Sequence, residues 1–149
     1  MPTLVTLFFI SIVALASLLT LPAQEARYEQ ARADVAATSA LAYRESVINY
    51  LNINPSFTGT VPDASITPLW GHVRDARWTN TVLSGGSLYV YESTPSSNRI
   101  LMDVLYTKTM KSYMVGKNQA GFLVSAKGFG TGITVPNAVP TGAIMIFGK

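Results

Sequence analysis

Residues 24–51 read QEARYEQARADVAATSALAYRESVINYL, and this segment decides the fold. It contains neither glycine nor proline, and its commonest residue is alanine, the strongest helix former. It is followed by Asn54-Pro55, where the residue before proline is disfavoured in a helix. We therefore predict an extended soluble helix over residues 24–51.

The predicted helix carries two apolar stripes at helical spacing. The first comprises Tyr28, Ala31, Val35 and Ala42, and the second comprises Leu41, Ile48 and Leu51. The first stripe is too thin to be buried against a large core, so we expect Tyr28, Ala31 and Val35 to dock against partner helices. The second stripe should pack on the domain that comes after the helix.

The residues before this helix form a different kind of segment, because residues 1–24 carry no ionisable side chain. Leu4–Leu21 reads LVTLFFISIVALASLLTL. About 20 such residues at 1.5 Å each span roughly 30 Å, the thickness of the hydrocarbon core. We predict a transmembrane anchor over residues 1–23. Whether Pro22 kinks one long helix or breaks it at the membrane surface stays open.

A cleaved signal peptide is the alternative, because Leu21-Pro22-Ala23 resembles a small-residue cleavage site. Cleavage near Ala23 would release a secreted binding domain. The absence of Lys and Arg before the apolar run, and the length of that run, favour retention in the membrane.

Small residues recur at three-residue steps in the predicted anchor and could pack against another membrane helix. They are Ser11, Ala14, Ser17 and Thr20.

The charges after the span leave the orientation of the chain in the membrane open. Arg27, Arg32 and Arg44 lie after the span, which favours a cytoplasmic C-terminal side, but acidic residues are interleaved with them.

Composition points away from an ordinary soluble enzyme. Only 13% of the 149 residues are charged, against roughly 25% in soluble domains. The chain has no cysteine, which excludes disulfides and Cys-zinc sites. The region after the helix, residues 52–149, is long enough for one modest domain.

This last region has the pattern of a β-rich domain. The predicted hairpins are Arg77–Leu83 with Ser87–Glu92, and Ser112–Gly116 with Gly121–Ala126, joined by Lys117–Ala120. Between the hairpins, Asn98 can cap a helix over Arg99–Met110. A short strand, TGITV at 131–135, and a final strand, Gly142–Phe147, complete the set. The prediction is an α+β fold in which the long N-terminal helix packs on a small antiparallel sheet with one additional helix.

Residues that could carry catalysis are sparse. His72 is the only histidine, and no nucleophile-elbow motif accompanies it. The carboxylates of the domain have no spacing typical of a catalytic pair, and Gly128–Gly132 lacks the phosphate-loop pattern. We therefore predict a protein that is not an enzyme, with no metal, no cofactor and no small-molecule substrate.

Charge is distributed unevenly along the chain. Residues 25–103 carry six basic and eight acidic side chains, whereas residues 104–149 carry five lysines and no acid. Those lysines are Lys108, Lys111, Lys117, Lys127 and Lys149. Gathered on one face, they could meet an acidic partner or anionic headgroups, and scattered, they would only solvate the surface. Without a recognition motif, nucleic acid is not expected as a partner.

A charge-free span, a proline at its end, an Ala-rich helix and a β-rich domain together resemble type IV pilin-like proteins. The residues before the span do not match a basic leader with a prepilin-peptidase site, and no acidic residue precedes Glu25, so we do not expect a classical pilin.

More specific motifs resemble the PilM family of conjugative-plasmid thin-pilus (type IVb) systems. They are Val47–Tyr50, Asn54–Val61, Tyr89–Tyr91, Val115–Ser125 and Pro140–Ala143. The resemblance implies a single-pass inner-membrane protein with a periplasmic C-terminal domain. It also implies a role in pilin transport or the pilus basal body, linked to conjugation, with other pilus assembly proteins or pilins as partners. A minor pilin incorporated into the fibre is the alternative role.

Overall fold

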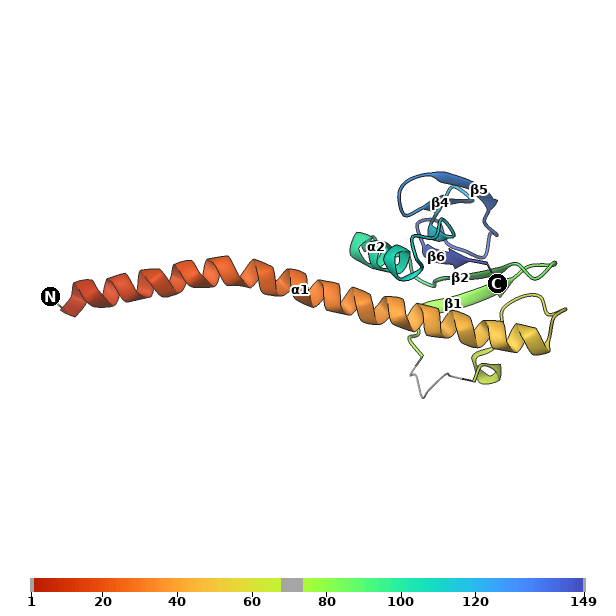
Figure 1. The fold of residues 1–149 in the computed structure, drawn as a ribbon, viewed down its shortest axis with the longest axis horizontal. Helices are drawn as coiled ribbons and strands as arrows, with labels where there is room; N and C mark the ends of the chain where they lie inside the picture. The colour runs from red at the N-terminus through yellow and green to blue at the C-terminus, as the bar shows by residue number, and fades with distance from the viewer. Residues whose placement is uncertain (1, 68–73, 149) are drawn as a thin grey trace. The chain divides into compact units, whose positions relative to one another are not determined.

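The computed structural model describes residues 2–67 and 74–148, with side chains described for residues 5–12, 24–67 and 74–148. The chain divides into two compact units, Met1–Arg32 and Ala33–Lys149. The first unit consists of the first part of helix α1, which spans Pro2–Ile53 (Figure 1). Pro22 therefore lies within a helix, so of the two arrangements left open by the sequence the continuous one is found.

The predicted anchor lies largely outside the described side chains, which omit residues 13–23. Within the part of the chain that the structure describes, no helix is both long enough and apolar enough to cross a membrane.

The second unit is built on a six-stranded antiparallel sheet with the order β1-β2-β6-β3-β4-β5. Its strands are β1 (Trp78–Val82), β2 (Leu88–Glu92), β3 (Val115–Gln119), β4 (Phe122–Ser125), β5 (Gly130–Thr134) and β6 (Ile144–Phe147). The last strand in sequence lies between the two hairpins and joins them into one sheet. The predicted α+β class is confirmed, and a short 3-10 helix, η1 (Asp63–Ser65), is added to the predicted elements.

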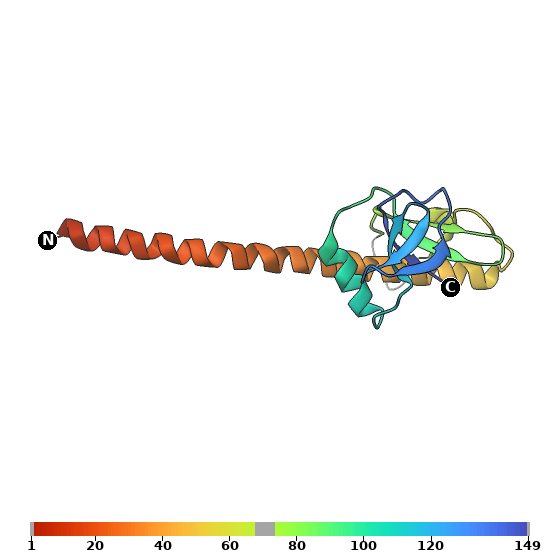
Figure 2. The ribbon, with the colours of Figure 1, turned by 90° about the horizontal axis from the view of Figure 1, so that it is seen from above.

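Helices α1 and α2 (Arg99–Lys108) cover one face of the sheet (Figures 1 and 2), and their buried side chains share one cluster with those of the sheet. The α1 residues buried there are Ala33, Ala36, Ala37, Ala40, Tyr43, Val47 and Leu51. The predicted packing of the second stripe is confirmed, because Leu51 is buried and Leu41 and Ile48 pack against the same cluster. The expectation that the earlier part of the helix would stay out of the core was wrong from Ala33 onward. These alanines share one buried cluster with apolar residues of α2 and of the sheet, so larger side chains from those elements cover them.

The opposite face of the sheet holds a second, smaller core. Tyr89 and Tyr91 of β2 point to this face, while Leu88 and Val90 point to the helices, since successive side chains of a strand alternate between its faces. The segment after β5 closes this face with Val135 and Val139. The sheet is thus covered on both sides, which is why every residue of β2 is buried.

Helix α2 spans Arg99–Lys108, and its N-cap is the predicted one. The Asn98 side-chain oxygen accepts a hydrogen bond from the backbone N–H of Leu101 at 3.0 Å. The helix ends two residues before the predicted Met110, because Met110 and Lys111 both adopt left-handed backbone conformations, with φ of 55° and 62°.

The second hairpin differs from its predicted boundaries. Lys117–Ala120 was predicted to connect the strands, but β3 continues to Gln119 and the turn falls at Ala120-Gly121, both with positive φ. A two-residue turn of this kind matches the twist of the flanking strands. The correction brings Lys117 onto a strand, where its neighbour across the hairpin is Val124.

A buried amide ties α1, β1 and the preceding loop together. The Asn80 Nδ2 donates to the Tyr43 hydroxyl at 2.7 Å and to the Val61 carbonyl at 3.2 Å. The Asn80 Oδ1 accepts from the Val61 N–H at 2.9 Å. Every polar atom of this side chain is therefore hydrogen-bonded away from water.

Candidate partner-binding surfaces

The predicted docking residues Tyr28, Ala31 and Val35 are exposed. Tyr28 is 65% exposed and Val35 is 69% exposed. The Arg32 guanidinium lies over the Tyr28 ring, 5.7 Å from its centroid. Val35 leaves α1 on the side opposite to the buried Ala33 and Ala37, because two residues turn a helix by about 200°. The structure describes no partner chain, so docking itself stays a prediction.

Of the predicted membrane-packing residues, Ser11 alone has a described side chain. It is exposed, and its hydroxyl donates to the Leu7 carbonyl at 2.9 Å, one turn earlier in the same helix. Ala14 and Ser17 lie outside the described side chains.

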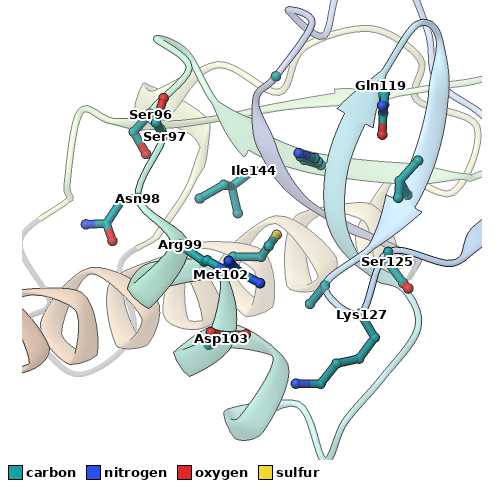
Figure 3. A pocket seen from close by; sticks show the side chains of 15 residues that line it. Ser96, Ser97, Asn98, Arg99, Met102, Asp103, Gln119, Ser125, Lys127 and Ile144 are labelled. Atoms are coloured by element: carbon teal, nitrogen blue, oxygen red, sulfur yellow. The ribbon is translucent and has the colours of Figure 1, made fainter.

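A groove of about 710 Å³ lies between α2 and the β3–β4 hairpin, and we call it the α2–β3 groove. In Figure 3, Arg99, Met102 and Asp103 on α2 lie across the groove from Gln119, Ser125 and Lys127. The remaining lining residues are Ser96, Ser97, Asn98, Lys117, Val124, Ala126, Gly128, Gly142 and Ile144. The sequence alone did not predict this site.

Three basic side chains line the groove, and each comes from a different element. Arg99 belongs to α2, Lys117 to β3, and Lys127 to the turn after β4. None of the three forms an ion pair with any described residue. The Lys127 ammonium lies over the Tyr106 ring, 5.2 Å from its centroid. Asp103 is the one acidic side chain in the lining.

A buried carboxylate shapes one wall of the groove. Glu92 is fully buried, and its oxygens accept from the Ser96 hydroxyl at 2.8 and 2.9 Å and from the Ser96 N–H at 3.2 Å. One of these oxygens also lies 3.4 Å from the Ile144 N–H, which donates to it. These bonds to an ionisable acceptor hold the loop before α2 against β6.

The lysines of residues 104–149 gather only in part. Lys117 and Lys127 share the α2–β3 groove. The Lys108 ammonium instead pairs with the Asp34 carboxylate of α1 at 2.9 Å, and Lys111 is exposed outside the groove. Lys149 lies outside the described residues. Arg99 is the third basic residue that lines the groove. In the sequence, only its position next to the cap residue Asn98 distinguishes it.

A second, smaller groove of about 520 Å³ has an apolar character and lies beside the C-terminal end of α2. Met110, Met114 and Phe147 line it, and Met110 is 94% exposed. The Arg44 guanidinium closes one side by donating to the Gly148 carbonyl at 2.9 and 3.2 Å.

The sequence singled out His72 as the one histidine, and this residue lies outside the described part of the chain. Among residues 2–67 and 74–148, no three His, Cys, Asp or Glu side chains form a group that could hold a metal ion.

Comparison with known proteins shows which family the chain resembles. The family model described as PilM matches residues 8–147, nearly the whole chain. No curated protein matches the chain significantly.

Two solved structures are similar. The first is of a protein called PilM from Escherichia coli B7A, which is 19% identical, with a TM-score of 0.58 over 79% of this chain and 92% of that chain. The second, of a protein called pilM from Pseudomonas aeruginosa 2192, is 27% identical, with a TM-score of 0.46 over 76% of this chain and 93% of that chain. At its level of identity, the E. coli structure supports the fold alone.

Proposed function

The chain belongs to the PilM family, and we propose that it is a non-enzymatic inner-membrane component of type IVb pilus assembly. In this role it takes part in pilin transport or forms part of the pilus basal body, and the apparatus serves conjugation. Family membership supports the pilus-related role in general. The finer assignment rests on the motifs at Asn54–Val61 and Val115–Ser125 and on the exposed face of α1.

We place residues 1–23 in the inner membrane and the domain in the periplasm. The support is the sequence: residues 1–24 carry no ionisable side chain, and the run from Leu4 to Leu21 is long enough to span the hydrocarbon core. All 19 charged residues lie after this segment.

Reporter fusions after Lys149 test this placement. Alkaline phosphatase, which is active only in the periplasm, should be active in the fusion, and a cytoplasmic fluorescent reporter should be dark. The reverse pattern would contradict the periplasmic domain and with it the pilus role. N-terminal sequencing of the mature protein provides an independent check, because a start at Gln24 would mean that the anchor is removed.

The observation that carries the assembly role is the exposure of Tyr28 and Val35 on a helix whose other side is committed to the core from Ala33 onward. Leaving large apolar side chains in water forgoes roughly 1.5–3 kcal/mol each relative to burial. Helices of pilus assembly proteins or pilins would bury this face in the assembled complex.

The combined variant Tyr28→Asp and Val35→Asp should abolish co-purification with pilus assembly proteins from crosslinked cells and should stop pilus formation. Ile53→Asp is the matched control, because Ile53 is 81% exposed at the other end of α1 and lies outside the docking face. Near-ultraviolet circular dichroism should show both proteins folded. Normal pili in cells carrying the double variant would refute docking through this face.

The alternative role, a minor pilin within the fibre, makes a different prediction for fractionation. An assembly component stays in the inner-membrane fraction when pili are sheared from cells. If the chain is instead recovered with the sheared pili in a fixed ratio to the major pilin, it is a fibre subunit.

A further inference from the structure

The α2–β3 groove combines a polar and basic rim with an apolar centre. Met102 and Val124 are half-buried in its lining and Ile144 is buried beneath it, while Ser97 and Asn98 lie exposed at the edge. Figure 3 shows Ile144 and Met102 in the middle of the groove, between the polar side chains of its two walls. A ligand of this groove therefore needs both apolar and polar groups.

The charged side chains of the groove indicate which sign of charge its ligand should carry. Arg99, Lys117 and Lys127 contribute three positive charges that no described carboxylate pairs with. Asp103 at the rim is the one acidic side chain of the lining, so basic side chains outnumber acidic ones there by three to one. The Glu92 carboxylate is fully buried and already accepts hydrogen bonds from Ser96, whereas the three cations are exposed and free to contact a ligand.

The size and spread of the groove indicate a chain segment and not a single ion. Its volume of about 710 Å³ lies within the roughly 300–1,000 Å³ typical of sites that enclose drug-sized ligands. The cations come from three separate elements, and the apolar Met102 and Ile144 lie between the two walls of the groove (Figure 3). Acidic side chains flanking an apolar one would match this arrangement.

We propose that the α2–β3 groove binds an acidic peptide segment of a partner protein, with its carboxylates at Arg99, Lys117 and Lys127 and an apolar side chain against Met102 and Ile144. The groove does not include the α1 docking face, and the proposal does not depend on the pilus role. The two can therefore fail separately.

The test uses the full-length chain purified in a neutral detergent. The probe is a fluorescein-labelled octapeptide in which glutamate alternates with leucine, and its counterpart carries glutamine at every glutamate position. Fluorescence anisotropy should show saturable binding of the glutamate peptide at concentrations up to about 1 mM, the weak end of measurable affinity. The glutamine peptide should bind at least ten-fold more weakly, and added salt should weaken binding of the glutamate peptide.

Variants locate the binding. Lys117→Gln and Lys127→Gln should each weaken binding of the glutamate peptide about two- to five-fold, the range of exposed ion pairs. Lys111→Gln, which removes an exposed lysine outside the groove, should leave it unchanged. Asp103→Asn should instead strengthen binding by a similar factor, a change that partial unfolding of the variant cannot produce.

Three results would overturn the proposal. They are the absence of saturable binding, equal binding of the two peptides, and an equal loss of binding in Lys111→Gln and the two groove variants. If a peptide in which glutamate alternates with glycine binds as tightly as the glutamate–leucine probe, and inorganic phosphate displaces both, the groove is a simple anion site and not a peptide site.

Discussion

Asn80→Ala removes only a small amide group, but we expect it to lower the free energy of unfolding of the domain substantially. The Asn80 side chain satisfies the Tyr43 hydroxyl and both polar backbone atoms of Val61, and all three residues are buried. In Asn80→Ala these three groups lose their partners inside the core. A buried polar group left without a partner costs about 1–3 kcal/mol. Because the vacated space can admit water to some of them, we expect a total loss of about 2–4 kcal/mol in the free energy of unfolding.

Two further variants divide this loss. Tyr43→Phe removes one hydrogen bond but leaves the Asn80 Nδ2 bonded to the Val61 carbonyl, so it should cost about 0.5–1.5 kcal/mol. The combined variant should lose less than the sum of the two, since both remove the same bond. Asn137→Ala is the matched control at an exposed position and should stay within about 0.5 kcal/mol of the wild type.

Urea unfolding of the full chain in neutral detergent measures these differences. Trp78 lies buried in β1, two residues from Asn80, so its fluorescence reports the loss of this packing. With a slope of about 2 kcal/mol per molar urea, the midpoint of Asn80→Ala should fall by about 1–2 M. A midpoint equal to that of Asn137→Ala would refute the reasoning, because it would show that the three groups are satisfied in some other way.

Two other predictions concern the two faces of the sheet. Ala37→Leu overfills the core around α1 and should lower the free energy of unfolding by about 1–3 kcal/mol, while the exposed Ala31→Leu should leave it nearly unchanged in the same urea assay. Burial raises the pKa of Tyr89 and of Tyr91 above the ordinary value of 10.0, so the folded state holds these protons more tightly than the unfolded state. Stability should therefore stay constant up to about pH 10 and fall as the pH rises through the raised pKa values. Combining Tyr89→Phe with Tyr91→Phe should flatten that fall, and an equally steep loss in the variant would contradict the assignment.

The strands could be predicted from the sequence because their signals are local. The hairpin predicted at Arg77–Leu83 and Ser87–Glu92 is found at Trp78–Val82 and Leu88–Glu92, within one residue at each strand end. The same holds for α2, where Asn98 marks the first turn. The end of α2 was missed because it depends on a left-handed conformation at Met110 and Lys111, which neither residue type favours.

The alanine stripe of α1 was missed for a different reason. Alanine contributes little to a hydrophobic pattern, so the more visible Tyr28 and Val35 defined the apolar face in sequence, although the structure leaves both exposed. Ala33, Ala37 and Ala40 are buried because they share one cluster with apolar side chains of α2 and of the sheet, which lie far away in the sequence. Local pattern cannot show that contact.

The α2–β3 groove depends on topology and could not have been predicted from spacing. Arg99 precedes Lys117 by 18 positions, and β6, from the end of the chain, must pair between β2 and β3 before the walls of the groove can form. The sequence showed only that lysines accumulate after residue 103. It could not show that Lys108 would instead pair with Asp34.

The two proposed contact surfaces share a property that separates them from the core. Val35 and the basic side chains of the groove are exposed and contribute little to packing, so substituting them should change binding and leave the free energy of unfolding nearly intact. The alanines facing the sheet should behave in the opposite way. Lys108 and Asp34 belong neither to the exposed contact residues nor to the buried alanines. Their ion pair joins α2 to α1, and it therefore helps to hold one wall of the groove in place. A variant of Lys108 that weakens peptide binding without touching the groove lining would therefore show that α1 positions α2 for recognition as well as for stability.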